Sequence, residues 1–301
     1  LCLLTTGGIS MIKMIVTDLD GTLLNKRKQL SQKTIDTLIK AQEEGYRLVL
    51  ATGRNYQSLK SIYQSLKMDQ FKTGAIIGLN GAEIYCFDQS YYQKSAMLAK
   101  EECQELVEYG HRHLCEVMVI SDQRVLDCIS PLLLFCKKIV YRLIHKVVLS
   151  TFEGQANEHL FIDVYDPRIE RANKVGFSQL PLYIDKKLSR FHRELDDKYE
   201  VVLVSKGWIE IMPKGINKGS GLVKIMNYFN LDQKEIICFG DGENDLSMLE
   251  IVESSYAMEN ALKKVKKIAH YSCPSNENHG VAVVVEKMIK GGQLSVSKDK
   301  I

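Results

Sequence analysis

Short apolar segments alternate with amphipathic ones along the first 80 residues. Residues 14–17 (Met-Ile-Val-Thr) have no polar alternate, which is typical of a strand that is buried on both faces of a parallel sheet. An amphipathic segment begins at Ser31, a good N-cap, and stops at Gly45. Strand patterns follow at 46–52 and, after a further helix, at 75–79. This β-α-β-α-β order predicts an α/β fold with a doubly wound, Rossmann-like parallel sheet and right-handed crossovers.

The regular alternation stops at about residue 82. A helical period over residues 100–109 is followed by β-branched segments without strict alternation, which predicts an inserted α+β domain. The strands expected within this insert are residues 116–120, 147–151, 159–164 and 200–204. Residues 136–149 are both basic and apolar, and their pattern is compatible with a helix, a strand pair, or both in succession.

The α/β pattern returns with an apolar strand at residues 208–212. The elements expected after it are a helix at 218–229, a strand at 235–239, a helix at 246–252, a short strand at 256–258 and a basic helix at 260–269. We therefore expect a discontinuous core of residues 11–81 and 210–289, an α+β insert of residues 82–209, and tails at 1–10 and 290–301.

Composition narrows the class of protein. The 301 residues are 45% hydrophobic and 26% charged, as in ordinary globular proteins. The formal charge of +3 and the lack of long like-charge blocks predict neither a nucleic-acid nor a membrane partner, and no apolar run approaches the roughly 18 to 20 residues of a membrane helix. The eight cysteines form no C-x-x-C pair, which favours reduced thiols and a cytoplasmic location. The sequence is compatible with a monomer or a homodimer.

Polar side chains stand at the carboxyl ends of three expected strands. They are Asp18 and Asp20 after the first strand, Thr52 at the end of the second, and Asp241, Asn244 and Asp245 after the strand at 235–239. Ligands bind at this edge of open α/β sheets. One Asp can attack phosphorus, a second can move a proton, and both attract Mg²⁺.

The alternative is that Asp-x-Asp-Gly is only a turn, because Asp and Gly are common turn residues. Taken singly, Thr52, Asn80 and Asn244 also suit a strand end, a turn or a cap. However, four carboxylates at one edge would repel one another, and a divalent cation removes that cost. The sequence therefore predicts a metal-assisted phosphate site.

Four motifs occur in a fixed order along the chain. They are Asp18-x-Asp20-Gly-Thr-Leu-Leu, Ala-Thr52-Gly53-Arg54, Lys218-Gly and Gly-Asp241-Gly-Glu-Asn244-Asp245. In these motifs the chain resembles the haloacid dehalogenase-like superfamily. The place of the insert, after Asn80-Gly81-Ala82, resembles the Cof-type subfamily with a type IIB cap, and so do residues 209–219, 257–261 and 275–281. The match covers about residues 13–289, and within the cap it holds only in outline.

The resemblance implies a Mg²⁺-dependent phosphatase that forms an aspartyl phosphate. It implies Asp18 as the nucleophile, Asp20 as general acid and then base, and Lys218 as the group that neutralises charge. The implied metal ligands are Asp18, Asp20 through its backbone carbonyl, Asp241 and Asp245. The residues expected to contact phosphate or substrate are Thr52, Gly53, Arg54, Asn80, Lys218 and Asn244, with Arg54 also able to stabilise its own loop.

The implied substrate is a small phosphorylated metabolite such as a sugar phosphate. A phosphomutase or phosphotransferase of the same fold is an alternative that the motifs do not separate from a phosphatase. A second alternative is a non-catalytic regulator that binds a phosphometabolite. Degraded motifs would favour the regulator, whereas this chain retains all the named acids and the lysine.

Overall fold

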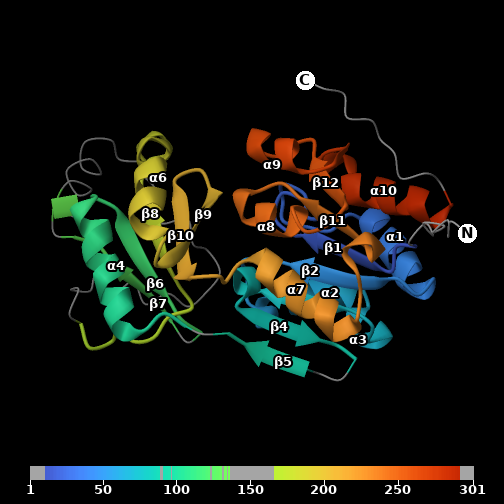
Figure 1. The fold of residues 1–301 in the computed structure, drawn as a ribbon, viewed down its shortest axis with the longest axis horizontal. Helices are drawn as coiled ribbons and strands as arrows, with labels where there is room; N and C mark the ends of the chain where they lie inside the picture. Colours follow the sequence, from blue (N-terminus) through green and yellow to red (C-terminus); the bar gives the residue numbers. More distant parts are fainter. Residues whose placement is uncertain are drawn as a thin grey trace, which may run out of the picture. The chain divides into compact units, whose positions relative to one another are not determined.

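The computed structural model describes residues 11–88, 91–95, 97–122, 124–130, 132–133, 135 and 166–291. It divides the chain into two compact units, both drawn in Figure 1. Unit 1 comprises Leu1–Ser95 and Asn217–Ile301, and unit 2 comprises Ala96–Ile216.

Unit 1 is built on one eight-stranded sheet. Its strands are β1 (Met14–Asp18), β2 (Arg47–Ala51), β3 (Ala75–Gly78), β4 (Glu83–Cys86), β5 (Tyr91–Lys94), β11 (Ile236–Gly240), β12 (Ser254–Met258) and β13 (Tyr271–Cys273). Its helices are α1 (Gln32–Glu43), α2 (Lys60–Ser65), α3 (Met68–Phe71), α7 (Lys218–Phe229), α8 (Leu246–Leu249), α9 (Lys263–Ile268) and α10 (Gly280–Ile289). The strand order is β13-β12-β11-β1-β2-β3-β4-β5, with parallel pairing from β13 to β3 and antiparallel pairing at β4 and β5. The expected doubly wound parallel sheet is confirmed.

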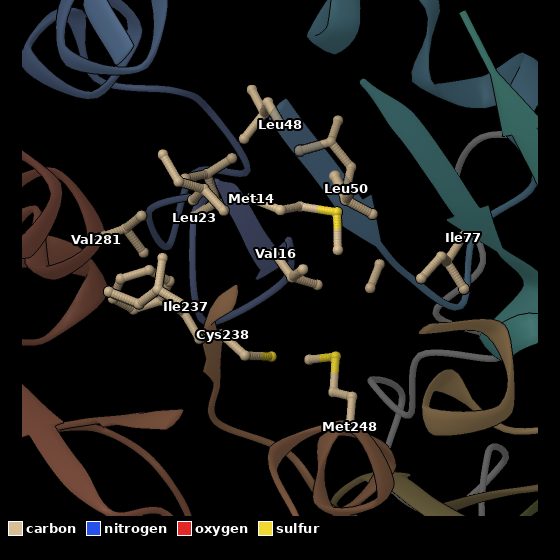
Figure 2. Close-up of a cluster of buried hydrophobic side chains, with 14 of the residues drawn as sticks. Met14, Val16, Leu23, Leu48, Leu50, Ile77, Ile237, Cys238, Met248 and Val281 are labelled. Atoms are coloured by element: carbon tan, nitrogen blue, oxygen red, sulfur yellow. The ribbon is translucent and has the colours of Figure 1, made fainter. Parts of the chain in front are cut away.

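Helices cover both faces of this sheet. Successive residues of a strand point to opposite faces, so Ile237 and Cys238 of β11 face different layers. Figure 2 shows Cys238 directed toward Met248 of α8, while Ile237 lies on the side of Val281 of α10. All four side chains belong to one buried apolar cluster. The strand therefore reads as a continuous apolar run, as the sequence indicated.

The described residues of unit 2 form an antiparallel sheet with two long helices. Its elements are α4 (Lys100–Arg112), β6 (Glu116–Ile120), β7 (Val125–Cys128), β8 (Lys174–Ser178), α6 (Pro181–Leu195), β9 (Tyr199–Ser205) and β10 (Trp208–Pro213). The strand order is β7-β6-β8-β10-β9. Helix α4 packs on β6 and β8, and α6 packs on β9 and β10, around a second apolar core. The expected α+β character of the insert is thus observed.

The unit boundaries lie later in the chain than expected. Strands β4 and β5 form a hairpin that extends the sheet of unit 1, so this unit reaches Ser95 rather than residue 81. Strand β10, expected to begin the return to the core, pairs with β8 and β9 in unit 2. The second boundary is therefore at Ile216 rather than residue 209. An apolar strand looks the same in either sheet, because only its hydrogen-bond partners decide which sheet it joins.

Several expected elements differ in length or fall outside the described residues. Helix α7 has the expected bounds, whereas α8 and α9 are shorter than the patterns suggested. The expected strands at 147–151 and 159–164, segment 136–149 and the tails at 1–10 and 292–301 lie outside the described residues. Among the residues that are described, no helix is long and apolar enough to cross a membrane.

Candidate active site

The carboxyl ends of three parallel strands bring the acidic motifs together. Strand β1 lies between β2 and β11, with Asp18 opposite Ala51 and Thr17 opposite Phe239. The chain therefore leaves this edge at Asp18, at Thr52 and, one residue after Gly240, at Asp241. The sequence motifs meet because parallel pairing in register puts their strand ends side by side.

A buried lysine connects two of the acids. Lys218, the first residue of α7, has a fully buried side chain. Its Nζ donates to Asp18 Oδ1 at 2.5 Å and to Asp245 Oδ1 at 2.6 Å. Burying charged groups is strongly unfavourable unless they are paired, so these two contacts explain how the ammonium is accommodated. They also hold it against the carboxylate of Asp18.

Asp245 also fixes the loop that carries Asp241. Its Oδ2 accepts hydrogen bonds from the backbone N–H groups of Asp241 and Gly242, at 2.8 and 2.9 Å. The carboxylate of Asp241 accepts from the Thr22 hydroxyl through Oδ1, at 2.8 Å. Both oxygens of Asp245 are thus used within the protein.

The donor set fits a hard divalent cation. Asp18, Asp241 and Asp245 each offer a carboxylate oxygen, and these atoms lie within 4.8 Å of one another. Among the described residues, Oδ2 of Asp18 and Oδ2 of Asp241 have no hydrogen bond, so they are open to a ligand. Three carboxylates face one ammonium, which leaves two negative charges without compensation when all are ionised. A cation such as Mg²⁺ prefers oxygen ligands of this kind and would balance that charge.

The protonation of the acids reflects this crowding. Burial, followed by the negative charge of Asp245, raises the pKa of Asp18 well above its ordinary value, although Lys218 opposes the shift. Burial and Asp245 likewise raise the pKa of Asp241 to about 6. The pKa of Lys218 is raised, because the attraction of Asp18 and Asp245 outweighs burial, so it remains an ammonium. A cation among these groups would favour their ionised forms.

Asp20 is held apart from this cluster. Burial acts to raise its pKa, but hydrogen bonds from Arg54 and Lys28 hold the pKa below its ordinary value. Arg54 binds both carboxylate oxygens, at 2.8 and 2.6 Å, and Lys28 Nζ lies 2.7 Å from Oδ1. The side chain of Asp20 is therefore ionised here and is not one of the clustered metal donors.

The remaining predicted residues form a polar rim on the loops that follow β2, β3 and β11. Thr52 is buried, and its Oγ1 accepts from the N–H of Arg54 at 3.2 Å, which leaves its own O–H able to donate. Asn80, in the left-handed region at φ 52°, accepts from Asn244 Nδ2 at 3.1 Å. A Cβ on Gly53 would lie 3.3 Å from the Asn80 amide, so glycine permits this approach. The rim thus brings together all of the predicted substrate-contacting residues of the β2, β3 and β11 loops.

Three supporting residues were not predicted from the sequence. Thr22 orients Asp241, Lys28 pairs with Asp20, and Asn260 Nδ2 donates to the backbone oxygen of Gly21 at 2.8 Å. Thr22 lies within the first motif and was available as a signal. Asn260 likewise lies within residues 257–261, which resemble the subfamily, whereas the contact of Lys28 arises from loop geometry, for which the sequence carries no periodic signal.

Known proteins are similar to this chain over most of its length. Residues 15–285 match the family model of haloacid dehalogenase-like hydrolases. A 5-amino-6-(5-phospho-D-ribitylamino)uracil phosphatase of Bacillus subtilis is 30% identical over 282 residues, covering 89% of this chain and 94% of that protein. An HMP-PP phosphatase of Escherichia fergusonii is 26% identical, covering 85% of this chain and 87% of that protein.

Solved structures are similar over nearly the whole chain. A haloacid dehalogenase-like hydrolase from Bacteroides thetaiotaomicron has a TM-score of 0.70 at 27% identity, covering 92% of this chain and 99% of its own. A sugar phosphatase of haloacid dehalogenase subclass IIB has a TM-score of 0.70 at 20% identity, covering 93% and 99%, a likeness that concerns the fold alone. The similarity therefore includes unit 2 as well as the sheet with the acidic cluster.

Proposed function

The chain belongs to the haloacid dehalogenase-like hydrolase family and is an enzyme of its phosphatase type, and from this premise we propose that it hydrolyses a small phosphorylated metabolite through a phosphoaspartate on Asp18. The observation that carries the proposal is the Lys218 ammonium held between Asp18 and Asp245, with an open oxygen of Asp241 beside them. Such an arrangement is preorganised for an anionic group that develops charge next to Asp18.

In the first step, Oδ2 of Asp18 attacks phosphorus and the bond from phosphorus to the leaving oxygen breaks. Asp20 gives that oxygen a proton, which requires that Asp20 be released from Arg54 and Lys28 and protonated before the step. Lys218 and the Thr52 hydroxyl stabilise the phosphoryl oxygens during the transfer. The products of this step are the free alcohol and an acyl phosphate on Asp18.

In the second step, water attacks the acyl phosphate and restores Asp18. Asp20, now a carboxylate, accepts the proton of that water, and inorganic phosphate leaves. We propose that Asp18, Asp241 and the backbone carbonyl of Asp20, with support from Asp245, would hold Mg²⁺, which would supply positive charge to balance the phosphate. Its place is supported by the donor set and by the two uncompensated charges of the cluster.

For the substrate, we propose a sugar phosphate or a related polyol phosphate. Relatives in Bacillus subtilis and Escherichia coli are named for a phospho-D-ribitylamino compound, and another relative is named for HMP-PP. These names share a small phosphorylated molecule, which supports the size and class of the substrate proposed for this chain.

A cytoplasmic location is part of the same proposal. The described cysteines are free and buried, and they are Cys86, Cys103, Cys115, Cys128, Cys238 and Cys273. Burial raises the pKa of the Cys115 thiol to about 12, so that this group is protonated and unreactive near neutral pH. Reduced thiols of this kind suit a reducing compartment.

The experiment that tests the proposal is phosphate release from a panel of sugar phosphates, nucleotides and p-nitrophenyl phosphate, with Mg²⁺ and with EDTA. Asp18→Asn is the matched control, because it keeps the size of the side chain and removes the nucleophile. We expect release that needs Mg²⁺ and is abolished in Asp18→Asn, with an unchanged circular dichroism spectrum. Retained activity in Asp18→Asn would exclude this residue as the nucleophile.

Other outcomes would favour the alternatives. Isomerisation of a sugar phosphate that needs a bisphosphate primer would indicate a phosphomutase. Binding without turnover of any member of the panel, in folded protein, would indicate a regulator.

A further inference from the structure

Unit 2 contains a pocket of its own, lined by residues of this unit alone. Its volume is about 490 Å³, which is within the range of small-molecule sites. The apolar part of its lining is Met97, Val119 of β6 and Leu126 of β7. The two strand residues also belong to the apolar core of unit 2, so this part of the wall is fixed by packing.

Cations outnumber acids around this pocket. The charged residues that line it are Lys100, Arg124, Arg168, Arg171, Asp122 and Glu170. They come from the start of α4, the turn between β6 and β7, and the segment before β8. Four positive charges thus face two negative ones across a concave surface, where walls of low dielectric constant strengthen the field.

The four cations that line the pocket differ in whether they form an ion pair. Arg168 forms a forked ion pair with Asp166, with Nη2 to Oδ2 at 2.6 Å and Nε to Oδ1 at 2.8 Å. Within the described part of the chain, Lys100, Arg124 and Arg171 have no ion pair. The charges of these three cations are therefore not balanced by an ion pair within the described residues.

The start of α4 adds to the same field. This helix has 13 residues and begins at Lys100, so the positive end of its dipole lies at the pocket wall. Its N-cap, Ala99, offers no side-chain acceptor to the first turn, although Glu102 accepts from the Ala99 N–H at 2.8 Å. A free anion at this end would be stabilised by the dipole as well as by the three side chains.

We propose that this pocket binds a small anionic ligand that carries a phosphate or carboxylate group joined to an apolar or planar portion. Arg124, Arg171 and Lys100 bind the anionic group, and Val119, Leu126 and Met97 contact the remainder. The ligand is a molecule other than the phosphatase substrate, so the inference does not rest on the proposed function.

Direct binding tests the pocket independently of catalysis. Pyrophosphate is titrated by calorimetry into the full chain in EDTA, where the metal-free carboxylates of unit 1 repel anions and no hydrolysis occurs. We expect the double variant Arg124→Gln/Arg171→Gln to bind at least about tenfold more weakly, because it removes two cations that form charged hydrogen bonds to the anion. Arg193→Gln, an exposed cation of α6 outside the pocket, is the matched control and keeps the affinity.

Equal pyrophosphate affinity in wild type and the double variant would overturn the proposal, as would the absence of binding to wild type. Lys100→Gln gives a second, independent measure if the double variant does not fold. Because this titration does not depend on turnover, a failure of the proposed phosphatase activity leaves its result interpretable.

Steady-state kinetics then tests whether the ligand of the pocket is separate from the substrate. We expect the double variant to leave KM unchanged for a sugar bisphosphate and for p-nitrophenyl phosphate while pyrophosphate binding is lost. A KM for the bisphosphate that is raised at least about tenfold would contradict a ligand separate from the substrate.

Discussion

At the scale of single residues, Asp245 differs from the other acids of the cluster. One of its oxygens accepts from Lys218, and the other accepts from the backbone of Asp241 and Gly242. Asp18 and Asp241 each keep an open oxygen instead. Asp245 is thus placed to position a lysine and a loop, and its contact with a metal would pass through water or through a weakened internal bond.

Gly21 lets the backbone of the first motif approach the carboxylate of Asp241 more closely than a residue with a side chain would. Its φ is +91°, and a Cβ there would lie 2.4 Å from Asp241 Oδ2. We expect Gly21→Ala to abolish Mg²⁺-dependent phosphate release and to destabilise the fold by about 1–2 kcal/mol through the left-handed backbone.

Gly45→Ala is the matched control for this variant. Gly45 has φ +92°, and a Cβ at this residue would have no other atom within 4 Å. The variant should show the same backbone cost in urea unfolding with normal activity. Equal activity of the two variants would contradict the role given to the close approach of Gly21 and Asp241.

Lys218 balances two buried carboxylates, so its removal should be costly. In EDTA, we expect Lys218→Met to lower the free energy of unfolding by about 3–5 kcal/mol at pH 8, because it leaves buried charges unpaired. Lys224→Met, on the same helix and hydrogen-bonded to the neutral Ser95, should cost far less. Urea unfolding measures both, and similar losses in the two variants would argue against the buried ion pairs.

At the scale of elements, α7 sets the position of Lys218. Asn217 caps the helix by accepting from the Ser220 N–H at 2.9 Å, and the Ser220 hydroxyl accepts from the Asn217 N–H at 3.2 Å. Lys218 follows immediately as the first helical residue. The cap therefore fixes both the start of α7 and the origin of the lysine side chain.

We expect Asn217→Ala to destabilise the protein by about 1 kcal/mol and to lower kcat, since the first turn of α7 loses its anchor. Ser31→Ala provides the comparison, because Ser31 caps α1 by accepting from the Thr34 N–H at 3.2 Å. It should lose similar stability, measured by urea unfolding, and keep its kcat. A kcat that is unchanged in Asn217→Ala would show that the cap does not position Lys218.

At the scale of the whole molecule, the acidic cluster couples stability to pH and metal. The pKa of Asp241 is raised to about 6, and that of Asp18 is raised as well. A carboxyl whose pKa is raised by folding favours the folded state at low pH, and this contribution is lost as the pH rises through the folded pKa. Metal-free protein should therefore lose stability between about pH 4, the unfolded value, and about pH 6.

Mg²⁺ should restore that stability only where the carboxylates are ionised. We expect the rise in Tm on adding Mg²⁺ to be small at pH 5 and larger at pH 8. At a hundredfold excess of Mg²⁺ over its Kd, binding would add roughly 2.7 kcal/mol to the free energy of unfolding. Asp241→Asn should reduce the rise at pH 8. Differential scanning calorimetry measures each case, and an equal rise at both pH values would contradict competition between protons and metal.

Local sequence patterns were sufficient to predict the parallel sheet and the motifs at its edge. Continuous apolar runs such as 14–17 specify buried strands, and the polar residues that follow them must lie at the carboxyl edge once the strands pair in parallel. The bounds of α7 also followed from its pattern, because the spacing of its apolar residues is a local signal.

Which strands join which sheet, and which partner each charged side chain takes, could be seen only in the tertiary structure. Strands β4, β5 and β10 have patterns that suit either unit, and pairing alone assigns them. The fork between Arg54 and Asp20, the shared ammonium of Lys218, and the cations that gather around the pocket of unit 2 join residues distant in sequence. Local patterns encode how each segment folds, whereas such contacts depend on the packing of segments that are brought together only by the completed fold.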